Sequence, residues 1–426
     1  MSRAPRADRD PLVLDPVAAL IETVSTLAPA PLARLRVDVV AVPFRMPVVT
    51  AAGAWTTRRS ILLTLRDADG AHGTGEIAPP PGEEAAAIAV VASLARTLDG
   101  LTPGEALAAI DADRAADADV AADATAGGPA IDADRTADPA QEVALASAIG
   151  AGIETALLDL VGHRAGRSVA ALLAGVSGRE EPRGRIAVSA LVSASGAEEA
   201  SADAAVEVAR GARCVKLKVG GEQDLAAFIR RIGAVRAAIG DDVELRLDTN
   251  GSWSLAEATD RLTASLLYRI AYVEQPVASV ADLAALRRAV HVPVAADEAV
   301  GGVAATRRLV DAGAADVLVV KPARVGGAVE TLRIAAIAFD AGIPIVLSTF
   351  YETGIGLAAA LHIAAALPGE DVAHGIATAS VLASDLLVRG PSRVGGALLL
   401  PEAAGLGVEL DPNVVAEFRE SRRGEP

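Results

Sequence analysis

Lysine is rare in this chain, and its few positions indicate chemistry. The 426 residues include 39 lysines and arginines together, but only Lys216, Lys218 and Lys321 are lysines. Arginine stays protonated in proteins, whereas burial or a nearby cation can lower the pKa of a lysine until the neutral amine accepts a proton. The three lysines are therefore candidates for acid–base catalysis, and two of them share the stretch 215–220.

Three carboxylates follow the lysine pair at regular intervals. Asp248, Glu274 and Asp297 are separated by 26 and 23 residues, and Lys321 follows 24 residues later. Each interval fits one strand-and-helix unit, so each side chain is predicted at the carboxyl end of its own strand. In α/β barrels these ends meet at the mouth that holds the active site. Three carboxylates at one mouth would suit Mg²⁺, for which Mn²⁺ can substitute.

A single Asp or Glu at a strand end has a simpler explanation, because such residues also cap helices or face solvent in loops. Three of them in register with two lysine-bearing strands favour a shared site instead. Lys216 and Lys218 are two residues apart, so on a strand they point to the same face. Beside a bound cation and partly buried, they are expected to have a lowered pKa and to act as bases.

Residues 186–376 alternate between short apolar strands and helical segments. Right-handed crossovers place the helices outside the sheet, which predicts a modified TIM-type (β/α)7β barrel. A doubly wound open sheet is the alternative, but no Gly-x-Gly-x-x-Gly follows the first strand to support it. The eight expected strands are 186–192, 213–219, 243–248, 270–274, 292–296, 316–320, 343–348 and 372–376.

The chain before the barrel is predicted to form an α+β unit. Residues 44–57 are expected to be a long loop that covers the active site, and the Ala/Asp-rich run 111–138 is expected to be a solvated insertion. The expected strands are 35–40, 60–65 and 73–77, and the expected helices are 83–98, 103–112 and 141–173. The predicted domains are an N-terminal extension (1–34), a capping domain (35–185), the barrel (186–390) and a C-terminal segment that returns to the capping domain (391–426).

Charge and cysteine content restrict the partners and the compartment. The formal charge of −16 argues against a nucleic acid or an anionic membrane as partner, because both would repel such a surface. The start of the chain contains acidic residues and several prolines, so it predicts neither a signal peptide nor a membrane span. Cys214 is the only cysteine, which excludes an internal disulfide and suits a reducing cytoplasm.

Several motifs together resemble the enolase superfamily, in its muconate-lactonizing branch. Within that branch the similarity is greatest to the o-succinylbenzoate synthase family, and it covers residues from about 35 to 410. The motifs are VKLKVG at 215–220, LDTN at 247–250, VEQP at 273–276, ADE at 296–298, VKP at 320–322, STFYETGIG at 348–356, GEIAP at 75–79 and HGIATA at 374–379.

The resemblance implies a Mg²⁺-dependent dehydration of 2-succinyl-6-hydroxy-2,4-cyclohexadiene-1-carboxylate through an enediolate, in menaquinone biosynthesis. Lys218 would be the base, Lys216 its support, and Lys321 would stabilise the intermediate by a cation–π contact. The remaining implied residues are Asp248, Glu274 and Asp297 for the metal, Ser348 and Thr349 for the substrate, and Asn250 near the metal, with a turn role for Asn250 as the alternative.

Other functions stay open at this point. An N-acylamino acid racemase or a cycloisomerase would use the same lysines, with Lys321 as a second acid or base. Dipeptide epimerases carry an Asp-x-Asp after the eighth strand, and residues 375–380 contain none, which disfavours that activity. A barrel that only binds is a further alternative, although all three carboxylates are present. The sequence leaves open whether the protein is a monomer or a homo-oligomer.

Overall fold

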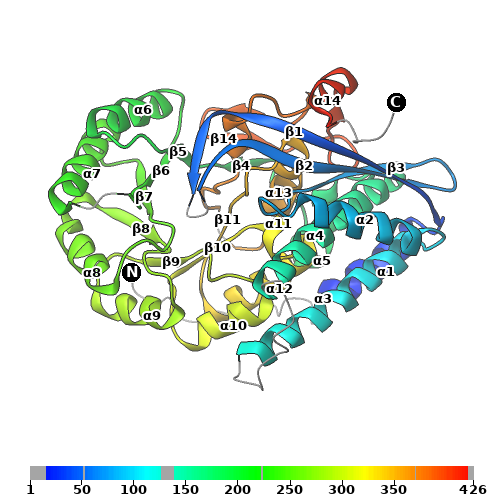
Figure 1. Ribbon diagram of the computed structural model, residues 1–426, viewed down its shortest axis with the longest axis horizontal. Coiled ribbons are helices and arrows are strands. Elements are labelled where there is room, and N and C mark those ends of the chain that lie inside the picture. Colours follow the sequence, from blue (N-terminus) through cyan, green and yellow to red (C-terminus); the bar gives the residue numbers. More distant parts are fainter. Residues whose placement is uncertain (1–15, 51–52, 126–138, 222–223, 370, 421–426) are drawn as a thin grey trace.

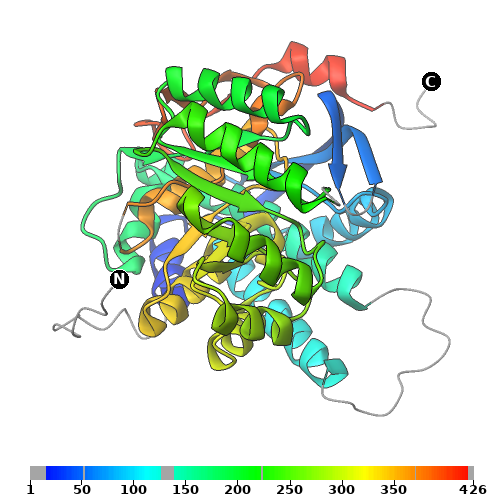
Figure 2. The same cartoon turned by 90° about the vertical axis from the view of Figure 1, so that its left-hand side faces the viewer.

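The computed structural model describes residues 16–50, 53–125, 139–221, 224–369 and 371–420. These residues form a capping part, which is an antiparallel sheet with helices, and a curled parallel sheet surrounded by helices (Figure 1). Turned by 90°, the molecule shows the helices that follow the middle strands lying over the outer face of the parallel sheet (Figure 2). The predicted mixed α/β architecture with a capping domain is confirmed.

The parallel sheet has seven strands in the order β11-β10-β9-β8-β7-β6-β5. Its strands are β5 (Ala190–Val192), β6 (Cys214–Lys218), β7 (Glu244–Asp248), β8 (Ile270–Glu274), β9 (Val294–Ala296), β10 (Val317–Val320) and β11 (Ile345–Leu347). The helices between and after them are α6 (Ala197–Ala209), α7 (Leu225–Ile239), α8 (Leu255–Ala264), α9 (Val280–Ala289), α10 (Val303–Asp311), α11 (Pro322–Val325), α12 (Ala328–Ala341) and α13 (Gly354–Ala366).

The first and the eighth predicted strands differ from the expectation. Residues 186–192 form two short strands, because β4 (Arg185–Ala187) leaves the barrel to pair antiparallel with β14 (Ala397–Leu399). The eighth position is held only by single parallel bridges, from Ser348 to Gly375 and from Val188 to His374. Here the backbone N–H of Leu347 donates to the His374 ring at 2.9 Å instead of to a strand carbonyl, which interrupts the ladder.

The capping part packs a three-stranded sheet on a long helix. Gly75 faces α4 so closely that a Cβ there would lie 2.0 Å from the carbonyl oxygen of Gly152. The segment Gln141–Ala165 of α4 is apolar and long enough to cross a membrane, but 67% of its most apolar window is buried in the protein, as in a core helix. The elements are α1 (Pro16–Leu27), β1 (Leu32–Thr50), β2 (Gly53–Asp67), β3 (His72–Ile77), α2 (Glu84–Leu98), α3 (Pro103–Thr125), α4 (Pro139–Ala165) and α5 (Val169–Ser177).

The prediction of a loop at 44–57 is wrong for residues 44–50 and 53–57, which belong to the long paired strands β1 and β2. Pairing continues from Pro43 with Thr57 to Val48 with Trp55, with a register shift between the two pairs. Pro47 lies in the extra residues of this bulge, where no ladder donor is needed. The hairpin places Trp55 over the parallel sheet, 5.5 Å from the ring of Phe350 between centroids.

The predicted solvated insertion at 111–138 is helical in its first half, because α3 continues to Thr125. Alanine has the highest intrinsic helix propensity, which offsets the aspartates. Asp111 also accepts two hydrogen bonds from Arg333 of α12, at 2.6 and 2.8 Å, and this anchors the helix. Residues 126–138 lie outside the described part of the chain, as do residues 1–15 before α1.

Buried glutamates join the capping sheet to the barrel. Glu76 of β3 accepts the backbone N–H of Thr353 at 2.9 Å and that of Gly356 at 3.0 Å, so its carboxylate lies at the positive end of α13. Beside it, Glu352 is 3% exposed. Burial raises the pKa of Glu352 to about 7, and the charge of Glu76 adds to this, while backbone hydrogen bonds and Arg58 oppose it.

The raised pKa of Glu352 predicts a pH-dependent stability. Between pH 4.5 and about 7 the folded protein holds this proton and the unfolded chain releases it. The free energy of unfolding should therefore fall as pH rises through this window, by about 3 kcal/mol at most. In Glu352→Gln, which cannot ionise, urea unfolding at pH 5 and pH 8 should lack this part of the slope. The exposed Glu402→Gln is the control, and identical pH profiles for Glu352→Gln and wild type would contradict the prediction.

Candidate active site

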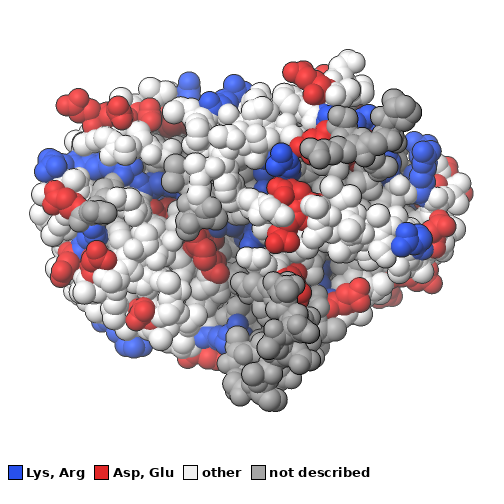
Figure 3. All heavy atoms as spheres, in the orientation of Figure 1, with Lys and Arg blue, Asp and Glu red and all other residues white. Residues whose placement is uncertain are grey.

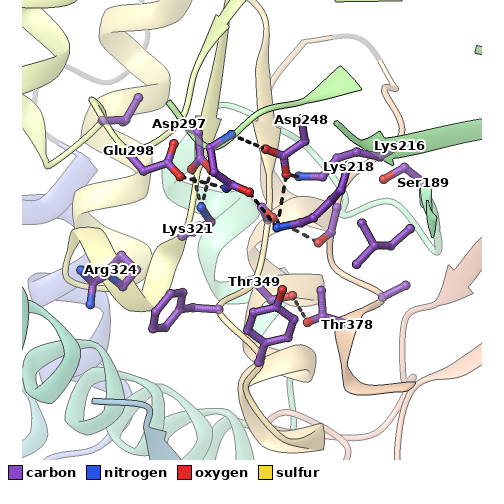
Figure 4. A pocket seen from close by; sticks show the side chains of 18 of the residues that line it. Ser189, Lys216, Lys218, Asp248, Asp297, Glu298, Lys321, Arg324, Thr349 and Thr378 are labelled. Atoms are coloured by element: carbon purple, nitrogen blue, oxygen red, sulfur yellow. Dashed lines mark hydrogen bonds and ion pairs between the residues drawn. The ribbon is translucent and has the colours of Figure 1, made fainter. Parts of the chain in front are cut away.

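The predicted catalytic side chains meet at the carboxyl end of the parallel sheet (Figure 4). Strand pairing places Lys218 opposite Asp248 on β7, and Asp248 opposite Glu274 on β8. Asp297 follows β9 directly, and Lys321 follows β10 at the N-cap position of α11. The side chains come from five consecutive strands, so the curl of the sheet turns them toward one region.

Lys216 lies between two carboxylates. Its Nζ is 2.9 Å from Asp248 Oδ2 and 2.7 Å from Glu274 Oε1. Burial by itself would lower the pKa of Lys216, but the charges of Asp248, Glu274 and Asp297 together raise it well above its ordinary value. Nearby negative charge therefore outweighs burial at Lys216, and the lowered pKa expected beside a bound cation stays a prediction.

Lys321 is also held by a carboxylate. Its Nζ donates to both oxygens of Asp297, a residue that is only 4% exposed. Burial would lower the pKa of Lys321, but the charges of Asp297, Glu298 and Glu274 raise it, which keeps the amine positively charged. Lys321 is thus a fixed positive charge at the far side of the site from Lys216 (Figure 4).

Lys218 is bound differently from the other two lysines. Its Nζ donates to the side-chain oxygen of Asn250 at 2.9 Å and lies 3.8 Å from Asp248 Oδ2. The side chain of Lys218 is 24% exposed, compared with 12% for Lys216. Its main partner is therefore a neutral amide, and its amine is the one of this pair that is more accessible from the cavity.

The three carboxylates of the site are almost completely buried. Asp248 and Glu274 are 2% and 1% exposed. Burial raises the pKa of Glu274 to about 8, Lys216 opposes this, and the like charges of Asp248 and Asp297 add to it. Carboxylate oxygens are the ligands that suit a hard divalent cation. Among the described residues, however, no group of three or more His, Cys, Asp and Glu is arranged as a ready metal site, and lysines are bonded to Glu274 and Asp297.

A cavity of about 910 Å³ opens above these groups. Trp55 of the β1–β2 hairpin and the neighbouring Phe350 and Tyr351 form an aromatic wall, with rings 5.5 to 6.4 Å apart between centroids. Tyr351 has a φ of +62°, which is uncommon for a bulky residue and marks a constrained loop at the wall. The cavity therefore has a charged floor at the strand ends and an aromatic side to which the capping part contributes.

The predicted substrate-binding hydroxyls both line this cavity. Ser348 donates to the carbonyl oxygen of Gly375 at 3.3 Å, and Thr349 is hydrogen-bonded to the hydroxyl of Thr378. Sequence reasoning did not single out Thr378, although it lies within the HGIATA motif at 374–379. It also missed Arg324, whose only signal is its place three residues after Lys321; its guanidinium lies 4.8 Å from the centre of the Phe350 ring.

Comparisons with known proteins agree with this geometry. Residues 34–174 match the mandelate racemase/muconate lactonizing enzyme N-terminal domain, and residues 199–414 match the enolase C-terminal domain-like family. The o-succinylbenzoate synthase of Thermobifida fusca is 40% identical over 205 residues, which are 48% of this chain and 63% of that protein. The o-succinylbenzoate synthase of Mycobacterium tuberculosis (strain CDC 1551 / Oshkosh) is 41% identical over 178 residues, 41% of this chain and 53% of that one. The matched region thus spans about half to under two-thirds of these relatives.

Solved structures extend the similarity over nearly the whole chain. Muconate lactonizing enzyme from Pseudomonas fluorescens complexed with muconolactone superposes with a TM-score of 0.76 and 27% identity, covering 92% of this chain and all of that one. The L-Ala-D/L-Glu epimerase from Bacillus subtilis gives 0.75 and 25%, covering 89% and 99%. Family matches and fold together establish that the chain belongs to the enolase superfamily of enzymes.

Proposed function

We propose that the chain catalyses the o-succinylbenzoate synthase reaction of menaquinone biosynthesis. The observation that carries the proposal is the contrast between the lysines: Lys216 and Lys321 are held by carboxylates, whereas Lys218 contacts an amide and has the most exposed side chain of the three. Relatives of 40% and 41% identity with that name support the choice of reaction. The substrate is a small carboxylate, and the charges of both signs scattered over the face in Figure 3 suit neither a nucleic acid nor an anionic membrane.

Asp248, Glu274 and Asp297 would hold Mg²⁺ in this proposal. Their fit rests on the donor set, three carboxylates at 1% to 4% exposure in a region where Glu274 has a raised pKa. The ion would supply positive charge against the negative charge that develops on the substrate carboxylate when the adjacent proton leaves. The ammonium groups of Lys216 and Lys321 already lie against these carboxylates, so they limit the repulsion among them.

Lys218 would carry out both proton transfers. As the base, it would take the proton from the ring carbon next to the carboxylate, leaving the enediolate. The carbon–oxygen bond to the ring hydroxyl then breaks, Lys218 returns the proton to the departing oxygen, and water leaves as the new double bond completes the aromatic ring. Lys321, kept positive by Asp297, faces the intermediate from the opposite side, where a cation is attracted to a π-face.

Racemisation of an N-acylamino acid is the second candidate function. The observation that favours it is that Lys218 and Lys321 line the same cavity from opposite sides (Figure 4). Incubation with N-succinyl amino acids in D₂O distinguishes the two, because exchange with inversion needs both lysines whereas dehydration needs one base. We expect dehydration to be the faster reaction; a kcat/KM for racemisation above that for dehydration would reverse the assignment.

Substitution of the lysines tests the proposed base. Lys218→Ala should lower kcat for o-succinylbenzoate formation by roughly 10³-fold, because general-base catalysis contributes about 10²- to 10⁴-fold. Lys218→Arg is the matched control that keeps the positive charge, and it should be equally inactive because arginine does not give up its proton. Absorbance of the aromatic product gives the rate, and o-succinylbenzoate formation at the wild-type rate in Lys218→Ala would refute the mechanism.

Removal of divalent cations tests the carboxylate set. Dialysis against EDTA should abolish dehydration, and Mg²⁺ should restore it. Mg²⁺ should also stabilise the protein against urea, by about 2.7 kcal/mol at 100 times its Kd, because it binds only the folded state. Asp248→Asn, which removes one ligand charge, should show a smaller gain than wild type at the same Mg²⁺ concentration. Full activity in the presence of EDTA would contradict the prediction.

A further inference from the structure

We infer that Asn250 and Glu298 form a positioning pair that fixes the direction of the Lys218 amine; this inference rests on the proposed role of Lys218 as the base. Lys218 Nζ donates to Asn250 Oδ1 at 2.9 Å. On its other side, Asn250 Nδ2 donates to Glu298 Oε1 at 3.0 Å. Glu298 follows Asp297 after β9 and lines the same cavity, so the pair connects the ends of β7 and β9, which lie on either side of β8.

The order of the three groups allows only one orientation of the amide. A lysine amine presents N–H groups to Asn250, and a carboxylate offers only acceptors. If the Asn250 amide were flipped, its oxygen would face the Glu298 carboxylate, which is repulsive, and its NH₂ would face Lys218, where it would either meet an ammonium or occupy the lone pair that the base needs. Glu298 therefore holds the amide oxygen toward Lys218, although Glu298 itself does not bond to that lysine.

The backbone of Asn250 supports the same orientation. Its φ is +51°, in the left-handed region that asparagine tolerates better than most residues. Its N–H donates to Asp248 Oδ1 at 3.2 Å, and the next residue, Gly251, also has a positive φ of +70° and bonds the carbonyl oxygen of Gln275. Asn250 thus fills the turn role that the sequence left open, and its side chain projects from a fixed turn.

The hydrogen bond to Asn250 has a consequence for proton transfer. A neutral amine has two N–H groups and one lone pair, arranged tetrahedrally around the nitrogen. Because one N–H is directed at Asn250, the lone pair is restricted to the remaining directions around Nζ. Asn250 and Glu298 then act as positioning residues, through the geometry of Lys218 and not by contact with the reacting atoms.

Paired substitutions test the orientation. Glu298→Ala removes the group that prevents the flip and should lower kcat roughly tenfold to a hundredfold with little change in KM. Glu298→Gln keeps an acceptor for the Asn250 amide and should recover most of the lost rate. Asn250→Gly keeps the left-handed turn but removes the amide, so it should fold normally and lose kcat. Glu199→Ala, on the exposed face of α6, is the control for loss of a glutamate.

The sharpest test exchanges the amide and the carboxylate between positions 250 and 298. Asn250→Asp still accepts from Lys218 but faces Glu298 with a second carboxylate, so kcat should fall. In the double variant Asn250→Asp/Glu298→Gln, the new amide NH₂ at position 298 can donate to the new carboxylate at position 250. Its kcat should therefore exceed that of Asn250→Asp alone. A merely structural role would give additive losses instead, and additive losses would overturn the inference.

The scarcity of lysine provides a readout that does not depend on catalysis. With only three lysines, protein labelled with ¹³C at the lysine ε-carbons should give three assignable signals. The Lys218 signal should shift or broaden in Glu298→Ala and Asn250→Gly and return toward wild type in Glu298→Gln. If these shifts occur in a protein that forms no o-succinylbenzoate, the proposed function fails and the pair stands. A Lys218 signal that is unchanged in Glu298→Ala would overturn the pair.

Discussion

The site depends on burying lysine ammonium groups among carboxylates at the end of the sheet. Lys216 bonds Asp248 and Glu274, and Lys321 bonds Asp297, so each buried carboxylate has a cation beside it. Unpaired charges at this depth would cost several kcal/mol each. Parallel pairing aligns Lys218, Asp248 and Glu274 across three strands, and Lys216 reaches the same level from two residues lower because its side chain is long. The charge balance therefore follows from strand register and from the curl of the sheet.

The sequence indicated which residues meet but not which of them pair. Spacing of about one strand-and-helix unit was enough to place Asp248, Glu274 and Asp297 at one mouth, because the carboxyl ends of parallel strands share an edge. Pairing depends on side-chain length and on the twist between strands, which no spacing encodes. For this reason the raised pKa values of Lys216 and Lys321 were not foreseen, and the different environment of Lys218 became visible only in the structure.

The capping region was harder to predict because tertiary contacts there override local signals. Pro47 and Gly53 suggested a loop, yet a bulge accommodates the proline and the hairpin continues on both sides. Alanines and aspartates suggested a solvated segment, yet Arg333 of α12 bonds Asp111 and α3 extends to Thr125. Both errors concern residues whose partners lie far away in the sequence. The barrel strands were easier to predict, because their apolar runs repeat with the period of the unit itself.

The charged side chains of the site and its aromatic wall come from different parts of this molecule. The lysines and carboxylates are fixed on strand ends, whereas the aromatic wall combines Trp55 from the capping hairpin with Phe350 and Tyr351 from the loop after β11. Under the proposed function the same two lysines could serve a dehydratase or a racemase, so we propose that the reaction depends on which substrate fits beneath the wall with its acidic carbon at Lys218. Glu76 bonds the capping sheet to the start of α13, directly after the loop that carries Phe350 and Tyr351. A change in the packing of the capping sheet would therefore alter the position of the aromatic wall more than the position of the lysines. Substrate preference can therefore vary in this architecture while the charged floor stays the same.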